Sequence, residues 1–509
     1  MFAYKHGNAN IKGATCLALG LALLAWNLSC APAPQQPAQP NVLFLAVDDM
    51  KDWVGALDGY EGTVHTPNID RLAARGMLFT NAHCASPKCA PSRAAIMTGL
   101  MPSTTGLYDN GHWWMPNLPD VVTIPAHFRS NGYAAVGAGK IFHHTAGNNP
   151  PNQWDDFLRL TFQNDPWFRE VKLNYPWSEV APFPEKYPFS GVEGLGHEND
   201  WGALPDIDDT ATADYAIDFL SKAHAKPFFL ACGIFRPHLP WYVPQQFFDQ
   251  YPLGDIVLPR VNDDDLDDIP PVGQELAGAR RSDYETIRDA DKWKQAVQAY
   301  LASITFADHQ IGRVLDALNQ SPHGENTIVV LWSDHGWHLG SKQHWHKSTL
   351  WEESTRVPLV ISAPGYDPGV CDRPVSLINL YPTLNELCEL PGRDLDGVSL
   401  APLLRNPQAE WNRPAVIQYQ QGNAAVRSDR YRYIHYSDGG EELYDHQTDP
   451  YEWTNLADSS AHATTKAELA GWIAKDWAES KPTKAAFDFD PETFTWTNKD
   501  TGAQVSGAR

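Results

Sequence analysis

The stretch NVLFLAVDDM, residues 41–50, is a continuous apolar run that ends in two aspartates. A run that is apolar at every position, rather than at every second one, is typical of a parallel strand buried on both faces. Three further segments, at 132–144, 227–240 and 326–336, have the same form, with an apolar run followed by a polar loop. These segments are therefore predicted to be the strands of one mostly parallel sheet.

Helical patterns separate the predicted strands. In TPNIDRLAARG, residues 66–76, Thr66 stands in position to cap a helix that begins at Pro67. Residues 291–320 carry apolar side chains at helical spacing and lead directly into the next predicted strand. The alternation predicts an α/β fold in which helices flank a large, mostly parallel sheet.

The chain of 509 residues is long enough for one large α/β domain with an appendage. Late in the chain the pattern changes to short strand-like pieces such as PAVIQY and RYRYIHY, with a final helix expected in TTKAELAGWIAKDW. This change predicts a smaller C-terminal α+β subdomain. The expected division is an export signal at 1–30, a linker at 31–40, a main domain with the catalytic site at 41–405, and the subdomain at 406–509.

The formal net charge of −23 argues against a general role in binding nucleic acid or an anionic membrane surface. It leaves room for a local cationic pocket that binds a small anion. Such a pocket would need lysine, arginine and histidine side chains gathered in one place.

The N-terminus has the pattern of an export signal. Lys5 and Lys12 precede an apolar core at 14–26 that is too short to span a bilayer, and a small-residue region follows it. Leu28-Ser29-Cys30 also resembles a bacterial lipoprotein site. The protein is therefore expected to be exported, either as a cleaved periplasmic form or tethered to the membrane through a lipid on Cys30.

Five of the seven cysteines lie beyond this N-terminal segment: Cys84, Cys89, Cys232, Cys371 and Cys388. They are odd in number and lack the Cys-x-x-Cys spacing of a metal site. At least one is therefore expected to be unpaired in an oxidising compartment. A disulfide between Cys371 and Cys388 is left open by the sequence.

The segment PKCAPSRAAIMTG, residues 87–99, predicts a helix with Pro91 at its first position and Gly99 after its end. Two interpretations of Cys89 follow. It is either a small buried cysteine without reactivity, or a reactive group at a helix N-terminus, where backbone N–H groups favour negative charge.

Charged side chains follow the predicted strands at their carboxyl ends, where ligands bind in open α/β sheets. Asp48, Asp49 and Asp334 would concentrate negative charge, and such a cluster is costly unless a cation occupies it. Hard carboxylate oxygens favour calcium or magnesium over zinc, and His335, a less hard fourth member of the cluster, leaves the identity of the metal partly open.

A second group of these side chains is basic. Its members are Arg93, Lys140, His143, His238 and Lys347. Together they would form a cationic rim that suits a small multivalent anion such as sulfate or phosphate.

Several motifs resemble those of one family. They are CAPSR at 89–93, the Asp-Asp pair, GKIFH at 139–143, FRPHLP at 235–240, SDHGWHLG at 333–340, KSTLWEESTRVPLV at 347–360 and ELYDHQTDPYEWTNL at 442–456. In this order they resemble the type I sulfatases of the alkaline-phosphatase-like superfamily. The histidine of SDHG, where many sulfatases have asparagine, resembles the iduronate-2-sulfatase branch.

The resemblance implies a mechanism. Cys89 would be converted to formylglycine by a formylglycine-generating or anaerobic sulfatase-maturating enzyme, and one hydroxyl of the hydrated aldehyde would attack sulfur. Calcium would be held by Asp48, Asp49, Asp334 and His335, with Cys89 at its edge. Arg93 and Lys140 would steady the formylglycine, His143 would assist proton removal, and His238 and Lys347 would contact sulfate and protonate the leaving alkoxide.

Three functions are compatible with these residues. The first is an exported sulfatase that acts on a sulfated polysaccharide or its oligosaccharides, with iduronate 2-sulfate, carrageenan and ulvan as substrates in this branch of the family. The others are a phosphomonoester or phosphonate hydrolase, and a non-catalytic glycan-binding surface protein. The aromatic residues at 112–114, 241–242, 337 and 345 would either stack on a sugar ring or pack in the core.

Overall fold

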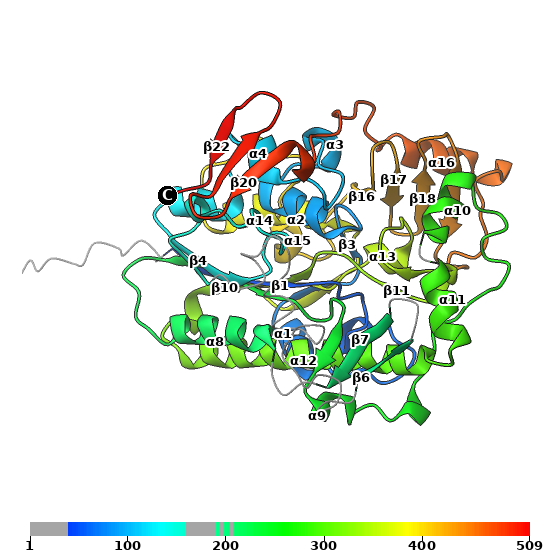
Figure 1. The fold of residues 1–509 in the computed structure, drawn as a ribbon, viewed down its shortest axis with the longest axis horizontal. Helices are drawn as coiled ribbons and strands as arrows, with labels where there is room; N and C mark the ends of the chain where they lie inside the picture. Colours follow the sequence, from blue (N-terminus) through cyan, green and yellow to red (C-terminus); the bar gives the residue numbers. More distant parts are fainter. Residues whose placement is uncertain (1–38, 159–188, 193–196, 204–206, 280) are drawn as a thin grey trace, which may run out of the picture. The chain divides into compact units, whose positions relative to one another are not determined.

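The computed structural model describes residues 39–158, 189–192, 197–203, 207–279 and 281–509 (Figure 1). The predicted export signal and most of the linker lie outside the described residues. Pro40–Arg509 forms one compact unit. Within the described part of the chain, each helix is too short or too polar to span a lipid bilayer.

An eight-stranded sheet forms the centre of this unit. Its strands, in order across the sheet, are β14 (Gly369–Cys371), β2 (Met77–Phe79), β13 (Leu359–Ser362), β10 (Thr327–Ser333), β1 (Asn41–Val47), β8 (Phe228–Ile234), β4 (Ala134–Gly139) and β5 (Asp156–Leu158). The strand β13 runs antiparallel to both of its neighbours, and every other pair is parallel. The predicted α/β fold with a large, mostly parallel sheet is confirmed.

Helices cover both faces of the sheet because the central strand is apolar on both. In β1, Val42 and Phe44 pack into the core that contains α2 (Cys89–Thr98), α5 (Ile124–Ser130) and α14 (Leu380–Leu387). Leu43 and Leu45 pack into the opposite core with α1 (Pro67–Arg75), α8 (Asp208–Leu220) and α12 (Trp293–Gln320). Figure 1 shows α8 and α12 below the sheet and α2 and α14 above it.

Helix α1 begins at Pro67 as predicted, but its cap differs from the prediction. Thr66 makes no side-chain capping bond to the helix, and its hydroxyl instead accepts the N–H of Gly55 at 2.8 Å. The first amides of α1 donate to a carboxylate from another helix, because Asp308 of α12 lies against this end. The N–H of Ile69 is 2.7 Å and that of Asn68 is 3.0 Å from Oδ1 of Asp308.

The C-terminal part of the chain forms two smaller sheets. Four antiparallel strands, β16 (Ala415–Gln418), β17 (Ala424–Arg427), β18 (Tyr431–His435) and β19 (Glu441–Asp445), are followed by α16 (Ala463–Ala470). The final helix is shorter than predicted. A 3-10 helix η8 (Lys484–Ala486) then leads into three antiparallel strands, β20 (Phe487–Asp490), β21 (Thr495–Asn498) and β22 (Gln504–Ser506), which the sequence pattern did not predict.

A buried ion-pair network joins the four-stranded sheet to the segment after β12 (Trp345–His346). Glu352 contacts Arg427 at 3.2 Å and also pairs with Arg432, whose Nε lies 2.6 Å from Glu452. Burial would raise the pKa of Glu352, but the two guanidinium groups hold it well below its usual range. The carboxylates here are therefore already balanced by arginine, and the cluster joins the two parts of the unit rather than forming a cation site.

Candidate active site

Cys89 is the first residue of α2, two positions earlier than the predicted start at Pro91. Lys88 is extended, with φ −152° and ψ 137°, and its carbonyl accepts the N–H of Ser92 at 3.0 Å. Pro91 therefore lies within the first turn, where its missing N–H breaks no helical bond. Gly99 ends the helix at φ +73°, as predicted. The thiol of Cys89 is buried at the N-terminus of this helix.

The carboxylates predicted at the strand ends do meet. Asp48 and Asp49 follow β1, and Asp334 follows its parallel neighbour β10. The backbone N–H of Asp49 donates to Oδ1 of Asp334 at 3.1 Å, so the two strand ends are tied together. All three side chains are completely buried. Parallel pairing of β1 with β10 therefore brings together carboxylates that are far apart in the sequence.

Arg93 connects these carboxylates from α2. Its Nε donates to Oδ2 of Asp334 at 2.8 Å and its Nη2 to Oδ1 of Asp48 at 3.1 Å. Its Nη1 donates to the backbone carbonyls of Lys140 and Ile141. The guanidinium therefore positions three segments at once, and its fixed fork of donors suits that task.

Lys140, at the end of β4, donates to Oδ2 of Asp48. Burial would raise the pKa of Asp48, but the charges of Lys140 and Arg93 outweigh it and hold that pKa well below its usual range. Asp48 is therefore a carboxylate at neutral pH.

Asp49 has a different environment. Its Oδ1 accepts Nζ of Lys347 at 2.5 Å, while its buried Oδ2 has no hydrogen-bond partner among the described residues. Burial raises the pKa of Asp49 to about 7, although Lys347 opposes this shift. The residue has φ +60° and is held there by the hydroxyl of Tyr300, which donates to its carbonyl at 2.7 Å. Such backbone strain in a non-glycine residue is often found at functional sites.

His335 directs the lone pair of one ring nitrogen toward these carboxylates and Cys89. Its Nδ1 lies 3.1 Å from the carbonyl of Gly336, an acceptor, so Nδ1 carries the proton and Nε2 does not. Nε2 lies 3.4 Å from Oδ1 of Asp49, 3.6 Å from Oδ2 of Asp334 and 3.3 Å from Sγ of Cys89. Burial lowers the pKa of His335, which keeps the ring neutral.

The donor set therefore fits a hard divalent cation. Asp48, Cys89, Asp334 and His335 offer ligand atoms within 4.8 Å of one another, and the unpartnered Oδ2 of Asp49 adds a further oxygen. Carboxylate oxygens with one neutral imidazole suit calcium or magnesium better than softer metals.

Lys347 and His238 lie at the edge of this cluster. Nζ of Lys347 is 3.0 Å from Sγ of Cys89. Burial lowers the pKa of Lys347, but the negative groups around it, Asp49 first, raise it overall, so it stays charged. His238 has Nε2 3.8 Å from Oδ2 of Asp49 and Nδ1 2.5 Å from the carbonyl of Leu239.

In the part of the chain that the structure describes, His143 makes no contact with the carboxylates of the cluster. Among the described residues its ring hydrogen-bonds Thr145, with Nδ1 3.0 Å from Oγ1, and none of the carboxylates. It lines a small cavity together with Ala90 and Pro91, the two residues that follow Cys89 in the chain. Tyr300 and Thr145 were missed from the sequence, because neither belongs to a strand-end pattern.

The aromatic residues pack in the core rather than lining an open sugar site. Trp113, Trp114, Trp241, Trp337 and Trp345 are all buried. The ring of Trp241 lies 6.1 Å from that of Trp337 and 6.3 Å from that of Trp345. The question of a disulfide is also answered, since Cys371 and Cys388 are both free thiols.

Fold and site together place the chain in the alkaline-phosphatase-like superfamily. A family model described as Sulfatase matches residues 40–390, and one described as N-sulphoglucosamine sulphohydrolase, C-terminal, matches residues 340–478. The chain belongs to the sulfatase family, and it is a sulfuric ester hydrolase.

Individual relatives agree with this assignment. The chain is 38% identical over 523 residues to a sulfatase of Formosa agariphila, with 97% of this chain and 98% of that protein covered. It is 32% identical over 400 residues to the iduronate 2-sulfatase of Homo sapiens, with 72% of this chain and 68% of that protein covered. The phosphonate monoester hydrolase of Agrobacterium radiobacter has the same fold, with a TM-score of 0.70, 22% identity, and 92% of this chain and 99% of that chain covered.

Proposed function

We propose that this sulfatase hydrolyses sulfate esters of sulfated polysaccharides or their oligosaccharides, using residue 89 as formylglycine and a calcium ion in the carboxylate cluster. The observation that carries the proposal is the position of Cys89. Its Sγ lies 3.3 Å from Nε2 of His335 and 3.0 Å from Nζ of Lys347. A nucleophile formed at this atom would stand between the cation site and a fixed ammonium group.

Two groups would supply chemistry that the side chains themselves do not. Formylglycine, made by oxidation of Cys89 by a maturating enzyme, would provide the hydroxyl that attacks sulfur. Calcium, held by Asp48, Asp49, Asp334 and His335, would act as a Lewis acid toward the sulfate oxygens. The unpartnered Oδ2 of Asp49 and the Nε2 lone pair of His335 support a cation at this place.

The chain's own residues would position the reacting groups. Arg93 ties Asp48 to Asp334 and so keeps the two carboxylates in register. Lys140 balances the charge of Asp48, and its Nζ also lies 5.0 Å from the ring of Phe235. Both cations are completely buried, so neither loses its position to solvent.

Sulfate would be bound at the edge of the cluster by Lys347 and His238. Because Lys347 stays protonated, it would stabilise negative charge on the sulfate oxygens rather than lose a proton. His238 has a side chain that is 21% exposed, and its Nε2 is free of the bond that Nδ1 makes to Leu239. Burial lowers the pKa of His238 well below its usual range, so the ring is neutral with its proton on Nδ1, and Nε2 would offer a lone pair to a substrate hydroxyl rather than a proton to the leaving alkoxide.

The substrate class is proposed from the relatives. The human relative is named for the 2-sulfate of iduronate, which is a uronic acid of glycosaminoglycans. We therefore propose sulfated glycan fragments, with a uronate 2-O-sulfate as the first candidate and algal glycans as the second. Export, with periplasmic or lipid-tethered location, and the division into residues 41–405 and 406–509 belong to the same proposal.

The phosphonate hydrolase fold is so similar that the fold alone does not separate sulfate from phosphate substrates. A panel assay separates them. Free sulfate is measured after incubation with 2-O-sulfated uronate disaccharides, sulfated glucosamine, carrageenan and ulvan oligosaccharides, and phosphate release is measured from a matched phosphate monoester. Faster turnover of the phosphate ester than of any sulfate ester would contradict the proposal.

The state of residue 89 is tested separately by mass spectrometry of the peptide that contains it. An aldehyde in protein isolated from a cell with a maturating enzyme is the expected result. Full activity with an unconverted Cys89 would exclude the formylglycine mechanism. Absence of both the aldehyde and activity would favour the non-catalytic glycan-binding alternative.

A further inference from the structure

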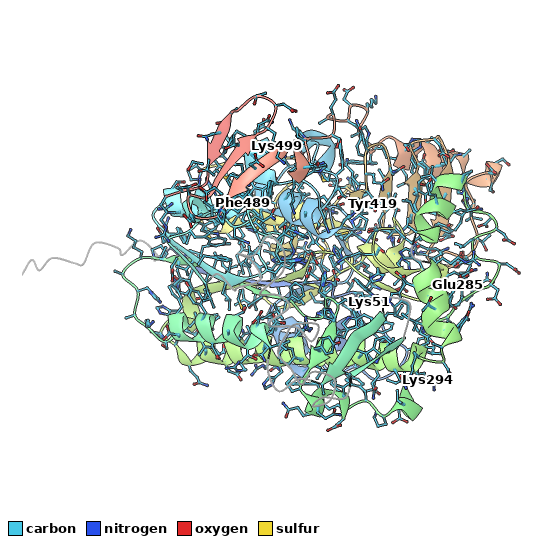
Figure 2. The ribbon with its side chains drawn as sticks, in the orientation of Figure 1. Lys51, Glu285, Lys294, Tyr419, Phe489 and Lys499 are labelled. Atoms are coloured by element: carbon cyan, nitrogen blue, oxygen red, sulfur yellow. The ribbon has the colours of Figure 1, made fainter. Side chains whose placement is uncertain are left out.

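Residues 479–509 lie beyond both matched family regions, which end at residues 390 and 478. This C-terminal segment nevertheless reaches the loop that carries His143. Phe489 of β20 packs against Trp113 with ring centroids 5.5 Å apart, and Trp113 donates its Nε1–H to the carbonyl of Ala146 at 2.7 Å. Figure 2 labels Phe489 on this C-terminal sheet.

One charged side chain of the C-terminal segment, that of Lys484, also contacts the loop that carries His143. Lys484, in η8, donates from Nζ to Oγ1 of Thr145 at 2.7 Å. Burial lowers the pKa of Lys484 to about 8, with Asp109 opposing the shift. The side chain is therefore still an ammonium group at pH 7, and an ammonium group has no lone pair with which to accept a hydrogen bond.

A second donor reaches the same hydroxyl. Nδ2 of Asn148 lies 2.8 Å from Oγ1 of Thr145 and 2.9 Å from the carbonyl oxygen of Thr145. A carbonyl oxygen only accepts, so the atom facing it must be the amide nitrogen. This fixes the orientation of the Asn148 side chain.

The hydrogen bonds of Thr145 then follow by counting. A threonine hydroxyl has one proton and two lone pairs. Lys484 and Asn148 occupy both lone pairs, so the proton of Thr145 is directed to its third partner, Nδ1 of His143, at 3.0 Å. Nδ1 of His143 is therefore the acceptor, and the ring proton is on Nε2.

We propose that Lys484 is a positioning residue of the sulfatase reaction, which acts through Thr145 to hold His143 in the Nε2–H tautomer. His143 then presents a hydrogen-bond donor to the small cavity lined by Ala90 and Pro91, the residues that follow residue 89, in place of the proton removal expected from the resemblance. The inference rests on the proposed role of residue 89 as the nucleophile. Burial, followed by the nearby rings and cations, lowers the pKa of His143 well below its usual range, so the ring is neutral.

The tautomer is measured directly by NMR on the full chain labelled with 15N-histidine. The signals of His143 are assigned by their loss in His143→Asn. The expected result is a protonated Nε2 and an unprotonated Nδ1 in the wild type, with an Nδ1–H population appearing in Lys484→Met. A wild-type ring protonated on Nδ1 would overturn the inference, whatever the state of residue 89.

Steady-state kinetics of Lys484 variants are the second test of the proposal. Partners that orient metal-ligating histidines contribute a factor of about 10 to 100, and we expect an effect of similar size where a partner fixes the tautomer of His143. Lys484→Met should therefore lower kcat about tenfold or more with KM changed less than twofold, and Lys484→Arg, which keeps a charged donor, should restore most of the activity. In a Thr145→Val background, Lys484→Met should have no further effect on kcat.

The matched control is Lys499→Met. Lys499 lies in the same C-terminal segment (Figure 2), has a side chain that is 45% exposed, and donates to the carbonyl of Ala485 at 2.9 Å rather than to the His143 loop. Its substitution should leave kcat unchanged. An equal loss of kcat from Lys484→Met with and without Thr145, or a rise in KM alone, would mean that Lys484 acts on substrate directly and would refute the positioning role.

Discussion

Nζ of Lys347 lies 3.0 Å from Sγ of Cys89, although the two residues are 258 positions apart in the chain. The same ammonium group lies 2.5 Å from Oδ1 of Asp49. One positive charge thus contacts both the proposed nucleophile and a proposed ligand of the cation, where a sulfate group would meet it. This contact makes Cys89 the first residue to test.

Cys89→Ala should abolish sulfate release while leaving the protein folded, because it removes only a small buried side chain. Cys84→Ala is the matched control, since Cys84 is equally buried five residues earlier, packs in the apolar core, and donates from Sγ to the carbonyl of Ser354 at 3.8 Å. Free sulfate and the melting temperature are measured for both variants. Sulfate release by Cys89→Ala at the wild-type rate would exclude residue 89 as the nucleophile.

Removal of divalent cations should abolish activity and lower the melting temperature, because the buried Oδ2 of Asp49 and the Nε2 lone pair of His335 would then lose the cation that they bind. Calcium should restore both, since a ligand that binds only the folded state stabilises it in proportion to RT ln(1 + [L]/Kd). Magnesium should restore less. Activity that survives exhaustive chelation, with no cation found by elemental analysis, would exclude the cation site.

Asp308→Ala should lower the free energy of unfolding by about 1–2 kcal/mol, because the first amides of α1 lose their acceptor. Burial raises the pKa of Asp308 from 3.8 to about 6. The folded state therefore holds a proton that the unfolded state has released between these values, so the contribution of Asp308 is fully present below pH 3.8 and is lost as the pH rises through about 6.

The cost of Asp308→Ala should accordingly be larger at pH 4.5 than at pH 7, and denaturant titrations at the two pH values measure it. The control is Asp316→Ala on the same helix, where an exposed pair with Arg71 should contribute less than about 1 kcal/mol. A cost that grows from pH 4.5 to pH 7 would contradict the raised pKa.

Trp241 tests the choice between packing and sugar stacking. Trp241→Phe keeps a flat ring and Trp241→Leu does not, so a stacking role predicts a higher KM for the leucine variant only. Because the ring is buried against Trp337 and Trp345, we expect KM values within about twofold of each other and a loss of unfolding free energy of about 2–5 kcal/mol in the leucine variant.

The sheet was predictable because its strands are apolar on both faces and end in polar loops. β1, β4, β8 and β10 all fall inside the predicted segments, and α12 follows the helical spacing of its apolar residues. The start of α1 was predicted, but its cap was not, because Asp308 comes from a helix 240 residues away. The C-terminal three-stranded sheet was missed, since its strands are short and half-exposed.

The sequence predicted which residues belong to the site better than it predicted the hydrogen bonds between them. Strand-end position identified the carboxylates, and parallel pairing of β1 with β10 brought them together. Arg93 bonds two of them only because α2 packs against the sheet at this position. The unpartnered Oδ2 of Asp49 also became visible only in the tertiary structure. Thr145 and Lys484 carried no signal, because neither belongs to a motif and the two are 339 positions apart in the chain.

The sequence by itself determined the parallel sheet, the family and the residues that gather at the strand ends, because apolar runs and local motifs are properties of short segments. Only the tertiary structure decided that Cys89 begins α2, that the tryptophans pack inside, and that a C-terminal lysine reaches the loop of His143. These features depend on distances between side chains far apart in the chain, and packing alone sets those distances.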